Sequence, residues 1–439
     1  MLQTLDTHRA PPAAPARRPS LARELRALGV QPRLLEGGHG VTAGGAALRL
    51  PLGEVLASPE RAAHLFGRLR NLLLQRIPVT LTLTDLGAGG RARAALQCIG
   101  QRLGAVLATP CVDRRRLGLA VQASELSLPA LQLMSRTLLG RGARFLLLDD
   151  VHLRTAGESA GDAGTAAIWS GLYQQRDRLS GVLPVYGGGV RSRCPLLGDE
   201  ASGALLPQRA LLVPPDSAWL PLDVHLPRFA AAGGALDAAR LEAALRRALA
   251  VADRLFDRLC WPDHAQRNDA YLNRRIAVTL HGIGDLVELQ RGDPGDLDCL
   301  RHWDRLLARL HRCLWDASRE LAHERGLLPA LACRNPALRW RDGAHRRDWQ
   351  QRWQNALRTD AVRHRNLLVL SPYGILPRAA ARPTRYADLL PLLAHADALS
   401  FAGAATFAGW RLREFRQFHC RAFAVMQRRN AAAFIAAGA

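Results

Sequence analysis

The chain has 439 residues, of which 48% are hydrophobic, so it is long and apolar enough for a large folded core. The formal net charge is +22, but all 60 basic residues are arginine and the chain contains no lysine. The missing lysine excludes a P-loop nucleotide site, Schiff-base chemistry and a pyridoxal phosphate enzyme, because each of these needs a lysine amine. We find no apolar stretch long enough for a membrane span.

The N-terminal part predicts alternating strands and helices. Residues 1–20 are rich in Pro, Ala and Arg, which predicts a disordered tail rather than a secretion signal. Within an N-terminal α/β half at 21–160, short helical patterns and a Gly-rich loop come first. The β-branched and apolar patterns then predict strands at 77–83, 117–121 and 145–148 and helices at 92–107 and 129–139. Pro78 predicts either an edge strand or the start of a strand.

A small-residue segment at 156–166 suggests a boundary before a second unit at 161–380. The later patterns predict helices at 167–179, 236–259 and 297–325, the last ending at Gly326, and strands at 182–185, 276–280 and 367–370. Residues 186–217 are expected to be irregular, and 381–439 to form a basic, helical C-terminal region. Strands that alternate with helices indicate an α/β fold.

Several short motifs have simpler explanations than a site. The segment 145–150 is similar to a Walker B strand, but a core strand ending in two acids is favoured because no P-loop lysine exists. The triglycine at 187–189 predicts only a flexible turn. The basic aromatic segment 411–429 could bind RNA or a membrane surface, but a helix docked on the core is favoured.

The cysteines and histidines do not predict a metal site. The spacing of four residues on one expected helix does not match the usual zinc spacings; these residues are Cys299, His302, His311 and Cys313. None of the eight cysteines forms a CxxC pair. We therefore expect reduced thiols and a cytoplasmic protein.

Six segments between residues 165 and 378 form an ordered pattern. They are Ile168-Trp169, Gly181–Val185, Leu206–Phe229, Asn273–Asp285, the segment at 317–329, and Arg365–Gly374. In order and spacing, this half of the chain resembles the second half of the catalytic barrel of the ribonucleotide reductase large chain. The most specific match is Asn273–Asp285, which resembles the family's RRIGLGVMGLAD segment.

The resemblance implies a ten-stranded α/β barrel of two five-stranded halves, complete or incomplete, with a helical C-terminal extension. In that family a finger loop passes through the barrel and carries a thiyl-radical cysteine. On a gap-free match, Gln208 stands at the radical cysteine, Ala210 at the general-base glutamate and Trp219 at a redox cysteine. Glutamine cannot form a thiyl radical, and alanine cannot accept a proton. Cys194 is a weak alternative radical cysteine, because no Asn or Glu flanks it in the family's pattern.

The end of the last expected strand is the candidate site for a phosphate or another part of a substrate. Its candidate residues are Arg365, Asn366, Ser371, Tyr373 and Gly374. Tyr373 replaces a small hydroxyl residue of the family, but backbone amides in this loop could still bind an anion.

We therefore expect a catalytically degenerate ribonucleotide-reductase-like protein that binds a nucleotide, another small anion or a protein partner. One alternative is a divergent, adenosylcobalamin-dependent ribonucleoside-diphosphate reductase, or another chemistry in the same barrel. A second alternative is an arginine-rich nucleic-acid-binding protein. The net charge favours the second alternative, but the even spread of the arginines does not.

Overall fold

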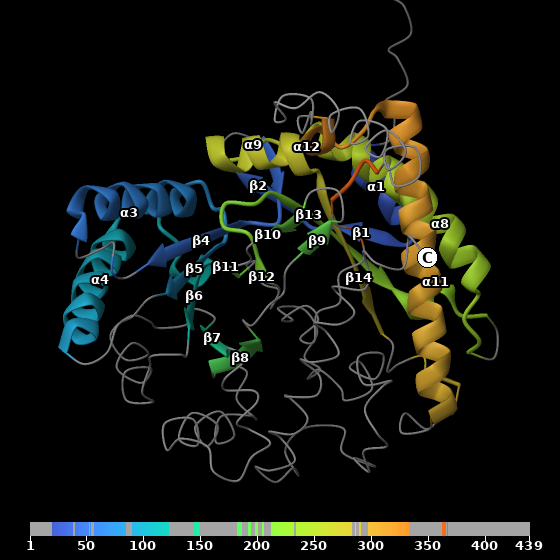
Figure 1. Ribbon diagram of the computed structural model, residues 1–439, viewed down its shortest axis with the longest axis horizontal. Coiled ribbons are helices and arrows are strands. Elements are labelled where there is room, and N and C mark those ends of the chain that lie inside the picture. Colours follow the sequence, from blue (N-terminus) through green and yellow to red (C-terminus); the bar gives the residue numbers. More distant parts are fainter. Residues whose placement is uncertain are drawn as a thin grey trace, which may run out of the picture.

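The computed structural model describes part of the chain. These residues are 20–37, 40–51, 53, 57–84, 90–122, 144–148, 182–186, 192–194, 198–200, 204–205, 212–231, 234–282, 286, 289–290, 297–332, 362–365 and 367. They form a mixed α/β structure, as the sequence predicts, with two main sheets flanked by helices (Figure 1). The strands within these ranges do not close into a barrel.

The larger sheet has five parallel strands in the order β4-β5-β6-β7-β8. Their bounds are Ala46–Pro51, Val79–Thr84, Leu117–Gln122, Arg144–Leu148 and Val182–Tyr186. The strands predicted at 77–83, 117–121, 145–148 and 182–185 are therefore confirmed. Because β5 lies between two neighbours, Pro78 marks its start and not a sheet edge. The sheet joins strands from both sides of the boundary expected near residue 160.

Helices α3 (Pro59–Leu74) and α4 (Gly90–Ala108) lie beside this sheet (Figure 1). The Ser58 side chain caps α3 by accepting a hydrogen bond from the backbone N–H of Arg61 at 3.4 Å, and Pro59 suits the first helical turn. The buried side of α3 carries residues at helical spacing, namely Ala62, Phe66, Leu69, Leu72 and Leu73. Helix α4 confirms the helix predicted at 92–107.

The second sheet has three strands in the order β1-β13-β14, with bounds Val30–Pro32, Trp219–His225 and Arg275–His281. Strand β13 is parallel to β14 and antiparallel to β1. On the other side of β14, the Val278 N–H donates to the carbonyl of Leu367 at 2.8 Å. The strand predicted at 276–280 is confirmed. Strand β13 was not predicted from the pattern, because Pro221 at its centre argues against a central strand.

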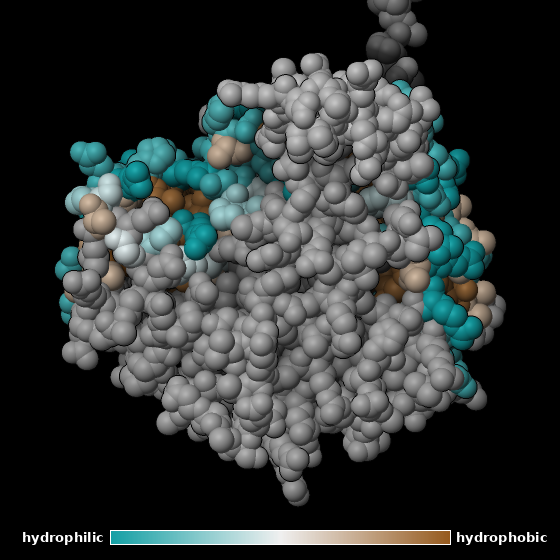
Figure 2. Space-filling model, in the orientation of Figure 1, coloured by the Kyte–Doolittle hydropathy of each residue, from teal (hydrophilic) through white to brown (hydrophobic). Residues whose placement is uncertain are grey.

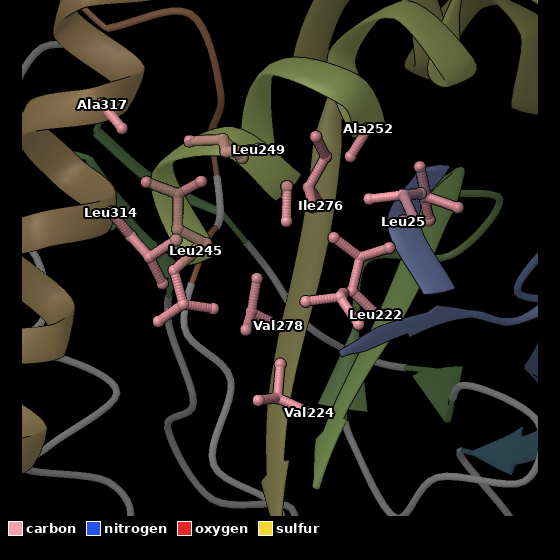
Figure 3. Close-up of a cluster of buried hydrophobic side chains, with 14 of the residues drawn as sticks. Leu25, Leu222, Val224, Leu245, Leu249, Ala252, Ile276, Val278, Leu314 and Ala317 are labelled. Atoms are coloured by element: carbon pink, nitrogen blue, oxygen red, sulfur yellow. The ribbon is translucent and has the colours of Figure 1, made fainter. Parts of the chain in front are cut away.

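The main core lies between this sheet and helices α1 (Leu21–Ala27), α8 (Ala238–Phe256) and α11 (Leu297–Arg325) (Figure 3). Its members alternate along the strands and recur at helical spacing, for example Leu222, Val224, Leu245, Leu249, Ile276, Val278 and Leu314. Helix α11 has the predicted bounds and is followed by Gly326 with φ of 92°. Helix α8 confirms the helix predicted at 236–259, and Asp237 caps it by accepting from the Arg240 N–H at 2.9 Å.

Two segments that were expected to be irregular contain strands, so these predictions were wrong. The Gly-rich segment forms a hairpin of β2 (Leu34–Gly37) and β3 (Gly40–Ala43), which leads into β4. The segment 186–217 contains two strand pairs, β9–β10 (Ser192–Cys194, Gly198–Glu200) and β11–β12 (Ala204–Leu205, Leu212–Val213). Strands of two or three residues are too short for a detectable alternation.

The remaining elements are helices α9 (His264–Asn273) and α12 (Pro329–Ala332) and two 3-10 turns at Arg114–Arg116 and Leu226–Phe229. The helices predicted at 129–139 and 167–179, the linker at 156–166, most of the strand at 367–370 and the C-terminal region at 381–439 lie outside the described residues.

The coloured side chains over α3, α4, α8 and α11 are mostly hydrophilic (Figure 2).

Among the described helices, none has the length and apolarity that crossing a bilayer requires.

Candidate ligand-binding face between the two sheets

A small buried cluster shows which faces of the two sheets meet. It joins Ala47 of β4 to Trp219 of β13 and Ala277 of β14, with Ala204 and Val213 of the β11–β12 pair between them. All five are at most 3% exposed. Because side chains alternate along a strand, every second residue from these positions lies on the same inner face.

On the larger sheet, this inner face is polar although it is buried. Ala47 is in register with Thr80, so Thr80, Thr82 and Thr84 of β5 share its face, and each is at most 3% exposed. The neighbouring Arg49 donates from Nε to Thr84 Oγ1 at 3.2 Å. The other face of β5 is apolar. Both faces of β5 are therefore buried, and the polar one is the inner face shared with Ala47.

The inner face of the second sheet carries ionisable groups toward the carboxyl ends of its parallel strands. Oδ1 of Asp223, on β13, lies 3.2 Å from Nε2 of His281 at the end of β14. The other carboxylate oxygen of Asp223 accepts a hydrogen bond from Nε of Arg33, which directly follows β1. In open α/β sheets, ligands bind beyond the carboxyl ends of the strands, so this is where a site is expected. Sequence reasoning missed this group, because its members become neighbours only through the pairing of three strands.

Trp219 stands where the family resemblance places a redox cysteine. Its side chain is buried, and its indole N–H donates to Ser217 Oγ at 2.8 Å. The guanidinium of Arg275 lies over the indole, 5.5 Å from the ring centroid, and Asp269 binds the same guanidinium through both carboxylate oxygens at 2.9 and 3.0 Å. A packed cation–π pair therefore surrounds Trp219.

The positions that the resemblance assigns to a finger loop lie in the chain between β11 and β12. Gln208 and Ala210 belong to residues 206–211, which lie outside the described residues. The flanking Ala204 and Val213 are fully buried against both sheets. Cys194 ends β9, where it pairs with Gly198 of β10, so it belongs to a different strand pair from the finger-loop positions.

The candidate residues at the end of the last expected strand are only partly described. Arg365 is buried, its Nη1 donates to Asn273 Oδ1 at 2.8 Å, and its backbone N–H donates to the Asn273 carbonyl at 3.2 Å. Arg365 therefore attaches the segment at 362–367 to the end of α9. Asn366, Ser371, Tyr373 and Gly374 lie outside the described residues, and their roles stay predictions.

A second group of charges is buried beneath α8 and binds the same segment. Asp253 is fully buried and accepts hydrogen bonds from Arg274, Arg325 and Arg363, and His364 Nε2 lies 3.2 Å from its Oδ1. Burial alone would raise the pKa of this carboxyl, but the His364 hydrogen bond and the positive charges of Arg274 and Arg363 hold it well below its usual range. Burial lowers the pKa of His364. Because Asp253 and His364 at its centre are fully buried, we assign this group to the stability of the fold and not to ligand binding.

Three of the four residues considered for zinc have described side chains, and each has other partners. The His311 ring stacks on Trp315 with 6.3 Å between centroids, and burial lowers the pKa of His311 to about 4. Cys313 is buried near the Glu242 carbonyl, and His302 contacts Trp303 edge-on. The Cys299 side chain lies outside the described residues. In the described part of the chain, no three His, Cys, Asp or Glu side chains are arranged to hold a metal ion.

Comparison of the sequence with protein-family models and with curated proteins gave no match.

Proposed function

We propose that the chain is a catalytically degenerate relative of the ribonucleotide reductase barrel, which binds a nucleotide or similar small anion without reducing it. In this proposal the sheet β4–β8 is one five-stranded half of the barrel, so Gly181–Val185 belongs to the first half and not, as the resemblance implied, to the second. Strands β13 and β14, with the segment at residue 367, belong to the other half, and the β11–β12 pair flanks the finger loop. These elements follow one another along the chain in the order that the family resemblance implies, which supports the proposal. The most specific sequence match, at Asn273–Asp285, also supports it.

One observation carries the binding part of the proposal, namely the polar inner faces of both sheets. Three buried threonines and Arg49 on one side, and Asp223, Thr279 and His281 on the other, line the faces that meet at the β11–β12 pair. Burying polar groups costs free energy unless they are hydrogen-bonded, and contacts such as Arg49–Thr84 and Asp223–His281 offset that cost here. A polar interior is suited to a polar ligand.

The side chains at the expected catalytic positions support the loss of ribonucleotide reduction. The residues at the radical, base and redox positions are Gln208, Ala210 and Trp219, and none of them can form a thiyl radical or take part in thiol exchange. A nucleotide bound between the sheets would therefore remain a ribonucleotide. The divergent-reductase alternative would need Cys194 in place of Gln208.

The experiment combines binding and turnover on the purified full chain. A thermal-shift screen would use ribonucleoside di- and triphosphates, adenosylcobalamin and short single-stranded nucleic acids. A ligand at a hundred times its Kd stabilises the folded protein by about 2.7 kcal/mol. We expect a shift with nucleotides and no deoxynucleotide after incubation with adenosylcobalamin and dithiothreitol. Deoxynucleotide formation would instead favour the reductase alternative.

Two arginine variants locate the binding. Arg49→Gln changes an exposed arginine of the inner face, whereas Arg61→Gln changes an exposed arginine in the first turn of α3. We expect the first variant to reduce the nucleotide-dependent shift and the second to leave it unchanged. If both variants change the nucleotide-dependent shift by the same amount, or neither changes it, the nucleotide binds away from the inner face.

A further inference from the structure

Arg33, Asp223 and His281 form a preorganised group that the family resemblance does not assign. We propose that this group binds small hydroxylated anions, in which a phosphate or carboxylate lies next to a hydroxyl. Arg33 would bind the anionic group, His281 would accept the hydroxyl hydrogen bond, and Asp223 would position both. The inference deepens the proposed function, because a nucleotide is one ligand with this chemistry.

The two oxygens of Asp223 hold the other two side chains in place. Asp223 is 7% exposed, with Arg33 on Oδ2 and His281 on Oδ1. The backbone also contributes, because the Arg33 N–H donates to the carbonyl of Pro221 at 2.9 Å and so continues the β1–β13 pairing. Both binding groups are therefore fixed before any ligand arrives, which reduces the entropy cost of binding.

Hydrogen-bonding capacity assigns the roles. Arg33 donates to Asp223 through Nε, and its side chain is 43% exposed. Its two terminal nitrogens, which have no hydrogen-bond partner among the described residues, can bind two oxygens of a carboxylate or phosphate. The carboxylate oxygens of Asp223 accept hydrogen bonds, so in the tautomer that fits this contact His281 donates from Nε2. Its Nδ1 is then an acceptor, and the ring is 18% exposed. An acceptor beside an arginine fork fits an anion with an adjacent hydroxyl.

Tight packing keeps the end of β14 in this geometry. Gly282, directly after His281, has φ of 78°, and a Cβ there would lie 2.6 Å from Pro227 Cδ and 3.2 Å from His225 Nε2. Only glycine fits this position without displacing the neighbouring strand end.

The test uses two probes that differ in hydroxyls alone. Glycerol 3-phosphate and n-propyl phosphate have the same carbon chain and the same anionic group, and calorimetry on the full chain gives their Kd values. We expect the unmodified protein to bind glycerol 3-phosphate roughly tenfold tighter, as one hydrogen bond predicts. His281→Leu should bind the two probes equally, and His281→Asn, which restores an acceptor, should recover part of the preference.

The arginine is tested separately. Arg33→Gln should weaken both probes about ten- to a hundredfold, as loss of a charged hydrogen bond predicts. Asp223→Asn should reduce both the affinity and the preference for hydroxyls. The matched controls are Arg258→Gln and His323→Leu, whose side chains are exposed on other elements, and they should bind like the unmodified protein. Circular dichroism and a melting curve confirm that each variant folds.

The outcomes separate this inference from the proposed function. Competition between glycerol 3-phosphate and a nucleoside diphosphate would identify a nucleotide as the source of the ligand. Binding of glycerol 3-phosphate without nucleotide binding would support the inference and refute the nucleotide part of the proposed function. Nucleotide binding that is unchanged by Arg33→Gln and His281→Leu would overturn the inference alone. If neither probe binds at millimolar concentration, the inference is also overturned.

Discussion

Replacing Asp253 with asparagine should destabilise the protein by about 3–5 kcal/mol, the usual cost of removing one partner from a buried ion group. The carboxylate accepts from Arg274 Nη2 at 2.6 Å and from Arg363 Nε at 2.8 Å, and it also accepts from Arg325. It is fully buried, so water cannot replace it. Asparagine keeps the shape but removes the charge, which leaves three guanidinium groups around a neutral amide.

Asp257→Asn is the matched control. Asp257 binds Arg274 at 2.6 Å and Arg325 at 3.0 Å, but its side chain is 39% exposed, so its loss should cost about 1 kcal/mol or less. Urea unfolding followed by tryptophan fluorescence gives both free energies. Because Arg363 bonds the carbonyls of Arg325 and Gly326 as well, the segment at 362–365 should also become sensitive to protease in Asp253→Asn. If the two asparagine variants lose similar amounts of stability, the role assigned to Asp253 is wrong.

Three further predictions concern backbone, protonation and core. Gly44→Ala should lower stability by about 1–3 kcal/mol, because φ is 73° and a Cβ would lie 2.5 Å from the Trp219 carbonyl oxygen. Gly104→Ala, in open space on α4, should instead raise the melting temperature. His311 has its pKa lowered by burial to about 4, so the stability it contributes above pH 6.5 is lost as pH falls toward 4. His311→Gln should make the slope of unfolding free energy against pH shallower in that window, by up to about 1.4 kcal/mol per unit. Leu249→Ala, at a fully buried core position, should cost about 2–5 kcal/mol in urea unfolding.

Elements with a strong local pattern were predictable from the sequence. Strand β5 alternates Thr with apolar residues, β6 to β8 are short runs rich in apolar residues, and α11 carries its apolar face over its whole length before Gly326. Strand β13 was missed because Pro221 lies at its centre, where only the neighbouring strands and the buried inner face support an extended chain. The hairpin β2–β3 was missed because its glycines were taken for a loop, although they also suit a tight turn.

The candidate site was harder to predict, because it depends on contacts between distant segments. The sequence indicated Arg365 and the segment containing His281, but the partners of both come from elsewhere. Asp223 reaches His281 only through the parallel register of β13 and β14, and Arg33 joins them through β1, 190 residues away in the chain. Asp253 likewise collects arginines from three separate segments. A residue pattern within one segment cannot show that side chains from distant segments come together.

Equilibrium dialysis of the purified full chain against a radiolabelled ribonucleoside diphosphate, followed by chromatography of the bound fraction, tests the central claim most directly. Dithiothreitol and adenosylcobalamin would be present throughout. A degenerate barrel with a surviving site should retain about one nucleotide per chain at saturation, all of it recovered as ribonucleotide. No retained nucleotide, or any conversion to deoxynucleotide, would contradict the account.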